Sequence, residues 1–170
     1  MGPRGRARAG AGLGLRYFRS SFTNRIDAKG RISVPASFRG VIAEGDWPGV
    51  CCLRSPTDRA VDAYSQARLD ELTEMIEEFD PMSEKYRHFN LALNGGCWEL
   101  NFDSEGRVSL PEELLHHARL SAEATFVGLG RYFQIWEPET YRARFEKAFE
   151  AIQTEPGLMR TRADRNGGAK

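Results

Sequence analysis

Two short segments of the chain repeat the same combination of Asp, Gly and Arg. The first runs from Asp27 to Pro35 as DAKGRISVP, and the second runs from Asp103 to Pro111 as DSEGRVSLP. Five of the nine positions are identical, and two more exchange one apolar residue for another. An arginine that leaves a tight turn can bind a guanine edge or a phosphate group. Arg31 and Arg107 are therefore the first candidates for contact with nucleic acid.

Each motif predicts a tight turn followed by a short strand and a short helix. Gly30 and Gly106 stand where such a turn needs a positive φ, and Asp27 and Asp103 can accept hydrogen bonds from amides of their own turn. Pro35 and its counterpart cannot continue a strand ladder but can begin a helix. We therefore expect each copy to be a β-hairpin that leads into a helix, with these Asp and Gly residues in structural roles.

Two further cations lie close to the first motif. Lys29 is the second candidate, as a point contact to phosphate, and Arg25 is the third, with Arg19 behind it on the preceding strand. The same residues allow a second interpretation, in which each Asp pairs with the Arg four positions later and only holds its turn closed. A carboxylate that faces phosphates repels them, which favours this structural role for the two aspartates.

Composition excludes several classes of protein. The 170 residues are 41% hydrophobic, enough for one moderate core that the two repeats share. No apolar run approaches the 18 residues of a membrane span, and the Arg-rich N-terminus has no apolar region typical of a secretory signal. An odd number of cysteines, three, without a CxxC motif indicates a reducing cytoplasm.

Charge is distributed unevenly along the chain although the formal net charge is zero. Residues 1–40 contain nine Lys or Arg and one Asp, whereas residues 62–84 contain eight Asp or Glu and one Arg. This asymmetry predicts one basic and one acidic surface.

Hydrophobic periodicity gives both halves the order strand, turn, strand, short helix, two strands and long helix. Long helices are expected at residues 65–79, 83–93 and 138–152. Aromatic side chains recur there at helical spacing, and we expect these aromatic stripes to pack in the core first of all. These stripes also allow a structural ring or a module that binds a partner protein. The expected divisions are an Arg/Gly-rich disordered extension (1–16), a first repeat (17–64), a helical connection (65–96), a second repeat (97–137), a C-terminal helix (138–155) and a flexible tail (156–170).

No group of residues predicts catalysis or a metal site. His116 and His117 are neighbours on a helix and point about 100° apart, while the third histidine, His88, stands alone. Cys51, Cys52 and Cys97 lie in strand patterns and are interpreted as small buried apolar groups; adjacent strand cysteines face opposite sides and make a poor metal pair. We therefore expect no enzyme activity, cofactor, metal or small-molecule substrate.

The doubled Asp-x-x-x-Arg motif, each copy followed by Ser-x-Pro, resembles the MraZ family of bacterial transcriptional regulators. The first strand, which begins Tyr17-Phe18-Arg19-Ser20, and the segment Asn94-Gly95-Gly96-Cys97 before the second motif add to the resemblance, which covers the chain from Tyr17 to Ile152. Two departures stand out. Residues 1–16 have no counterpart in the family, and Glu105 occupies the place that Lys29 has in the first motif.

The resemblance implies an α+β fold: two tandem AbrB-like (SpoVT-AbrB) repeats that form a swapped-hairpin, pseudo-dimeric barrel with flanking helices. It also implies a ring-like homo-oligomer that binds double-stranded DNA at short direct repeats in the promoter of the division and cell-wall gene cluster. Such a regulator would be cytoplasmic and nucleoid-associated, without a membrane partner. Because one chain offers only a few cationic contacts, avidity from several protomers would be part of its mechanism.

Overall fold

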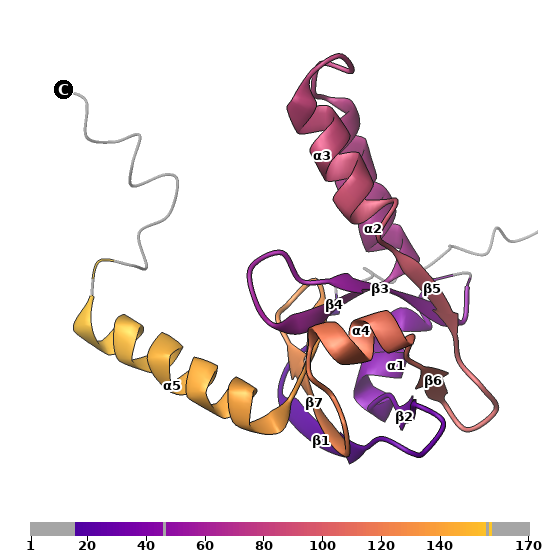
Figure 1. The fold of residues 1–170 in the computed structure, drawn as a ribbon, viewed down its shortest axis with the longest axis vertical. Helices are drawn as coiled ribbons and strands as arrows, with labels where there is room; N and C mark the ends of the chain where they lie inside the picture. The colour runs from indigo at the N-terminus through magenta and orange to yellow at the C-terminus, as the bar shows by residue number, and fades with distance from the viewer. Residues whose placement is uncertain (1–15, 46, 156, 158–170) are drawn as a thin grey trace, which may run out of the picture.

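The computed structural model describes residues 16–45, 47–155 and 157, so the expectations for residues 1–15 and for most of the C-terminal tail lie outside the described residues. Strands and short helices alternate along the chain, and three longer helices interrupt or follow them (Figure 1). The first half comprises β1 (Ser21–Arg25), β2 (Arg31–Ser33), α1 (Ala36–Ile42), β3 (Gly49–Arg54), β4 (Ala60–Tyr64), α2 (Gln66–Glu77) and α3 (Glu84–Leu93). The second half comprises β5 (Trp98–Asn101), β6 (Arg107–Ser109), α4 (Glu112–His117), β7 (Glu123–Gly128), β8 (Phe133–Trp136) and α5 (Pro138–Thr154).

The two repeats exchange strands within one antiparallel sheet. Its strand order is β1-β7-β8-β4-β3-β5, and a separate two-stranded sheet joins β2 to β6. The first strand of each repeat therefore pairs with the third strand of the other: β1 pairs with β7, and β5 pairs with β3. Neither repeat contains all the strand partners that it needs, so the two copies fold as one unit.

The structure corrects two expectations about the repeated motif. The strands on either side of the first turn do not form a paired hairpin, because they share only the bridge between Ile26 and Ile32 before they diverge. Instead of pairing with each other, β1 pairs with β7 and β2 pairs with β6. The expected closed barrel is also wrong, since β1 and β5 remain at the two edges of an open sheet. The mixed α+β class itself is confirmed.

One core contains buried residues from both repeats, as their length predicts. Phe38 of α1 lies at its centre, 1% exposed, with its ring 5.3 Å from that of Phe18, 6.5 Å from Phe126 and 5.0 Å from Phe133 between ring centroids. The buried sides of β2 and β6 reach the same core. The core therefore holds the two-stranded sheet, with both turns at its ends, against the six-stranded sheet.

The longer helices project from this body instead of closing over it. α2 and α3 pack against each other as a hairpin, and α5 extends away from the sheet (Figure 1). Ser65 and Ser83 cap α2 and α3 by accepting hydrogen bonds from the backbone N–H of the residues three positions on. None of the described helices is long and apolar enough to cross a membrane.

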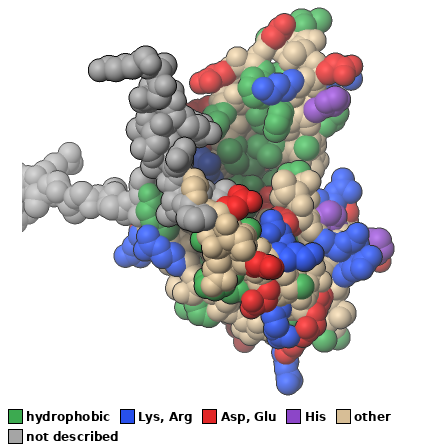
Figure 2. Space-filling model, turned by 90° about the vertical axis from the view of Figure 1, so that its left-hand side faces the viewer, with side chains coloured by type: hydrophobic (Ala, Val, Ile, Leu, Met, Phe, Trp, Pro, Cys, Tyr) green, Lys and Arg blue, Asp and Glu red, His purple; other side chains and the backbone are tan. Residues whose placement is uncertain are grey.

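The expectation that the aromatic stripes belong to the core is wrong for α5. Phe145, Phe149 and Ile152 are 48%, 50% and 57% exposed, because α5 extends away from the sheet (Figure 1). On α3, Phe89 and Leu91 are exposed as well. Figure 2 shows hydrophobic side chains gathered in the upper part of the molecule, over the α2–α3 hairpin, with acidic side chains around them. These helices leave apolar surface uncovered in a single chain.

Candidate nucleic-acid interface

The first turn is closed by the side chain of Asp27. Its Oδ1 accepts hydrogen bonds from the backbone N–H of Lys29 and of Arg31, each at 2.9 Å, and its Oδ2 lies 2.6 Å from the Nε of Arg31. Gly30 has a φ of +74°, which confirms the predicted left-handed position. A chain with Asp, Gly and Arg at these positions thus forms a turn that also fixes one nitrogen of its own arginine.

The second turn repeats this geometry. Asp103 Oδ1 accepts from the backbone N–H of Glu105 and of Arg107, each at 2.9 Å, and its Oδ2 lies 2.8 Å from the Nε of Arg107. Gly106 has a φ of +73°. One contact differs, because Nη2 of Arg107 also pairs with Glu105 at 2.6 Å. Glu105, which stands where the first turn has Lys29, therefore binds one of the donor nitrogens of Arg107.

These hydrogen bonds lower the pKa of both aspartates. The backbone N–H of Arg31 makes the largest contribution for Asp27, and that of Arg107 makes the largest for Asp103; the arginine side chains lower both pKa values further. A carboxyl group whose pKa is lower in the folded state stabilises that state above its unfolded pKa, about 3.9 for Asp. This stabilisation is lost as the pH falls through the folded pKa, so both turns should stay closed at neutral pH and loosen only in acid.

We expect the backbone amide resonances of Arg31 and Arg107 to titrate with midpoints below the ordinary Asp value, because each amide donates to one of these carboxylates. An NMR titration from pH 7 to pH 2 measures this directly. In Asp27→Asn the Arg31 transition should disappear while the Arg107 transition remains. A midpoint at or above about 3.9 for the wild-type amides would contradict the proposed role of the carboxylates.

The pairing of β2 with β6 brings the two arginines onto one surface. In the register Arg31 lies opposite Ser109, and Ser33 lies opposite Arg107. Side chains of opposed residues share a face of the sheet, so these four residues form one face, here called the ribbon face, while Ile32 lies buried beneath. The hydrogen bond from Arg107 to Asp103 makes the largest contribution to the raised pKa of Arg107. The negative charge of Asp27 makes a smaller contribution in the same direction. The two turns thus lie at opposite ends of a ribbon that is only three residues long in each strand.

The other predicted cations lie at different distances from this face. Lys29 is exposed within the first turn itself. Arg25 is exposed on β1, where it stands opposite Glu123 of β7. Arg19 lies further back, with its guanidinium carbon 5.4 Å from the ring centroid of Tyr17. The structure therefore places Arg31 and Arg107 on one face and Lys29 in the first turn, with Arg25 at the end of β1 and Arg19 before that strand.

Sequence reasoning missed Arg39 at the second turn. Arg39 donates from Nε to the carbonyl oxygen of Val34 at 3.1 Å, and its guanidinium lies so close to Gly106 that a Cβ there would be 2.6 Å from Arg39 Cζ. The 76-residue offset aligns Arg39 with Leu115, whose side chain packs near Gly30. This exchange of an arginine for a leucine was the signal available in the sequence. Arg39 therefore places a positive charge beside the second turn, where Glu105 stands in place of the lysine of the first turn.

Alanine at Gly30 or Gly106 is expected to reduce the free energy of unfolding by about 1–2 kcal/mol, because an L-residue is strained at positive φ. Only Gly106→Ala should also displace Arg39, since the Cβ at Gly30 meets Leu115 at an ordinary 3.5 Å. Urea unfolding measures the first effect, and DNA affinity measures the second. Equal DNA affinities of the two variants would show that Arg39 does not contribute to the interface.

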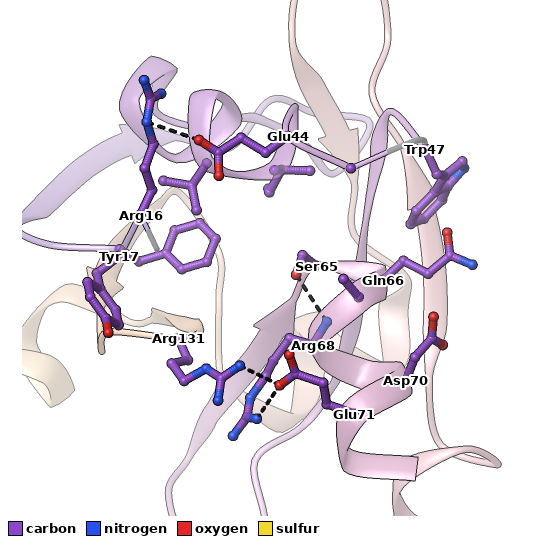
Figure 3. A pocket seen from close by; sticks show the side chains of 15 residues that line it. Arg16, Tyr17, Glu44, Trp47, Ser65, Gln66, Arg68, Asp70, Glu71 and Arg131 are labelled. Atoms are coloured by element: carbon purple, nitrogen blue, oxygen red, sulfur yellow. Dashed lines mark hydrogen bonds and ion pairs between the residues drawn. The ribbon is translucent and has the colours of Figure 1, made fainter. Parts of the chain in front are cut away.

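A large hollow in the described structure lies away from the ribbon face. A cavity of about 690 Å³ is bounded by Tyr17, α1 and the start of α2. All of its charged residues except Asp70 form ion pairs: Arg16 with Glu44 at 3.0 Å, and both Arg68 and Arg131 with Glu71 (Figure 3). Opposite charges are therefore balanced around this cavity, and none of the predicted DNA-binding residues lines it.

The histidines, Cys51 and Cys52 occupy the expected elements, whereas Cys97 precedes β5 and is only partly buried, which corrects its expected place as a buried strand residue. His116 and His117 are adjacent on α4, and His88 is exposed on α3. Cys51 and Cys52 are both buried on β3 and face different apolar clusters, as the strand pattern predicts. Within the described part of the chain, no group of three or more His, Cys, Asp or Glu side chains is arranged to hold a metal ion.

Comparison with known proteins gives one consistent result. The model of the family described as "MraZ protein, putative antitoxin-like" matches residues 93–160. A "Transcriptional regulator MraZ" of Pelagibacter ubique is 43% identical over 130 residues, which are 76% of this chain and 81% of the relative. Its namesake in Beijerinckia indica is 44% identical over 136 residues, 80% of this chain and 83% of the relative. Another, in Rickettsia canadensis, is 37% identical over 139 residues, 82% of this chain and 91% of the relative.

These alignments span most of the chain and most of each relative, and they confirm the resemblance predicted from the doubled motif. On its sequence and its twin-turn structure, the chain belongs to the MraZ family, in which these relatives are named transcriptional regulators.

Proposed function

We propose that this protein is a transcriptional regulator that binds double-stranded DNA with its ribbon face. The observation that carries the proposal is the β2–β6 register, which puts Arg31 and Arg107 at diagonal corners of one face, with Ser33 and Ser109 at the other two corners. Each Asp binds its arginine through Nε, which limits the motion of the guanidinium before any ligand arrives. A side chain held in this way loses less conformational entropy on binding.

The dimensions of the ribbon suit the major groove, which admits a two-stranded β-ribbon. Diagonal neighbours in antiparallel strands lie about 7–8 Å apart, which corresponds to about two base-pair steps. Arg31 and Arg107 can therefore reach acceptors two steps apart, either guanine edges or phosphates. Lys29 and Arg25 would add contacts to phosphate on the side of the first turn.

Electrostatics predicts that one protomer binds weakly. The first turn has two cations and one carboxylate, whereas the second has two carboxylates and relies on Arg107 and Arg39. With so few phosphate contacts, affinity at physiological salt is low. Several linked protomers, each on one short repeat, would raise the affinity by about 10²–10⁴. The proposal therefore includes a ring-like homo-oligomer on direct repeats in the promoter of the division and cell-wall gene cluster.

The uncovered helices support assembly. Phe145, Phe149 and Ile152 of α5 are about half exposed, and exposed apolar surface of this kind marks contact sites between proteins. We further propose that the strand exchange is a swapped-hairpin, pseudo-dimeric AbrB-like arrangement. It would have repeats at 17–64 and 97–137, a helical connection at 65–96 and a C-terminal helix at 138–155. This function would place the protein on the bacterial nucleoid.

An electrophoretic mobility-shift titration tests the function. We expect the full chain to bind DNA from immediately upstream of its own gene at concentrations at which an equal length of random DNA stays unbound. Affinity should fall linearly with the logarithm of salt concentration. Equal affinity for both DNAs would reject the promoter function.

A second candidate is a structural ring, or a ring that binds a partner protein, without DNA specificity. The exposed apolar residues of α3 and α5 favour it, because they need no DNA to find a partner. Light scattering after size exclusion separates the two candidates. A stable assembly with no preference for the upstream DNA would favour the structural ring.

A further inference from the structure

Two of the three cysteines, Cys51 on β3 and Cys97 just before β5, lie in the same apolar cluster. In the β3–β5 register Cys51 lies opposite Glu99, and Cys52 lies opposite Trp98. Cys97 directly precedes Trp98, so continuing this register by one residue brings it next to Leu53 on the face of Cys51, and all three residues belong to one apolar cluster. Cys51 and Cys97 pack in the same apolar cluster beneath α2 and α3, whereas Cys52 points into the main core.

The two thiols differ in exposure and in acidity. Cys51 is completely buried, and Cys97 is partly exposed at the start of β5. The neighbouring Cys51 thiol lowers the pKa of Cys97, although the partial burial of Cys97 and the charge of Glu99 oppose the effect. The neighbouring Cys97 and burial raise the pKa of Cys51. Since the thiolate is the reactive form, Cys97 is the cysteine that reacts first with an oxidant from solution.

We propose that Cys97 and Cys51 form a peroxide-sensitive pair that closes an intramolecular disulfide. The Cys97 thiolate attacks one oxygen of hydrogen peroxide, the O–O bond breaks, and the departing hydroxide takes a proton and leaves as water. Cys97 is then a sulfenic acid. The Cys51 sulfur attacks the Cys97 sulfur, the S–O bond breaks, and the departing hydroxide takes the Cys51 proton as a second water. Two thiols are oxidised, and one peroxide is reduced to two waters.

The chain around Cys97 allows the small movement that the bond needs. Diagonal neighbours are about 7–8 Å apart between Cα atoms, whereas a disulfide needs about 4.4–6.8 Å. Cys97 precedes β5 and follows Gly95 and Gly96, so the end of the strand can approach β3 without disturbing its register. The disulfide would join β3 to the α3–β5 junction and close a loop that contains β4, α2 and α3. Oxidation would thus fix the base of the helical hairpin.

The test treats the reduced full chain with hydrogen peroxide, blocks remaining thiols by alkylation and maps the linked peptides by mass spectrometry without reduction. We expect a link between Cys51 and Cys97 within one chain, the loss of two thiols, and a melting temperature several degrees above that of the reduced protein. Cys52→Ala is the matched control, because it removes the neighbouring thiol on the opposite face and should form the same link at the same rate.

Two single variants test the order of the steps. Cys51→Ala should accumulate a sulfenic acid at Cys97 that dimedone traps, and Cys97→Ala should resist peroxide. If Cys51→Ala folds poorly, the linked peptides mapped in the wild type and in Cys52→Ala still test the proposal. A link between Cys51 and Cys52, a link only between chains, or a Cys51–Cys97 link that forms only in urea would overturn the proposal.

Discussion

The double variant Arg31→Ala/Arg107→Ala is expected to lose at least about 100-fold in affinity for the upstream DNA. A bidentate arginine contact to a base contributes about 1–3 kcal/mol, and a phosphate contact adds about 0.9 to the slope of log K against log salt. Both arginines lie on the ribbon face and emerge from turns with the same geometry, so their loss removes both halves of the interface. Mobility-shift titrations at two salt concentrations measure the affinity and the slope.

The matched control for this variant is Arg54→Ala/Arg87→Ala. It changes the net charge by the same amount, but both residues are exposed and lie outside the ribbon face, on β3 and α3. We expect it to bind DNA within a few-fold of the wild type. Light scattering must show the same assembly for all three proteins. Equal losses in both double variants would mean that net charge, and not the ribbon face, determines binding.

Phe38→Ala is expected to reduce the free energy of unfolding by about 3–5 kcal/mol, the usual cost of removing a buried Phe side chain. The ring is 1% exposed and packs against aromatic rings of β7, β8 and the N-terminal segment, so the cavity cannot close without moving both repeats. Because a domain of this size is only marginally stable, the loss is a large part of its total stability. Urea unfolding followed by circular dichroism measures it.

Phe89→Ala provides the comparison within the same protein. Phe89 is 45% exposed on α3 and packs only against Phe79 among the described aromatic rings, so its loss should cost about 1 kcal/mol or less. Similar losses in the two variants would contradict the assignment of Phe38 to the centre of the shared core. A Phe38→Ala protein that lost one of two separate unfolding transitions would show that the repeats fold independently.

The local geometry of the site followed from residue types alone. Asp27, Gly30 and Pro35 each have one role that their chemistry allows: side-chain acceptor, residue at positive φ, and first residue before a helix. The structure shows all three roles in both repeats. The order and class of the elements were also predictable, because hydrophobic periodicity is a local property and the second repeat provides an independent copy of it.

The exposure of the α5 stripe could not be predicted from periodicity. Tyr141 packs against Trp136, but Phe145 and Phe149 stack on each other and remain half exposed. The same spacing occurs in a helix that covers its own sheet and in one that awaits a partner. Which of these applies depends on the direction in which the helix leaves the body.

The sequence by itself thus determined two matching turns, each with an aspartate, a glycine and an arginine, and the family to which they belong. Only the tertiary structure decided that β2 pairs with β6, that the sheet stays open, and that Arg39 of one repeat lies against Gly106 of the other. The physical reason is range. A turn is fixed by hydrogen bonds within five residues, whereas strand partners more than 70 residues apart are selected by the packing of one shared core.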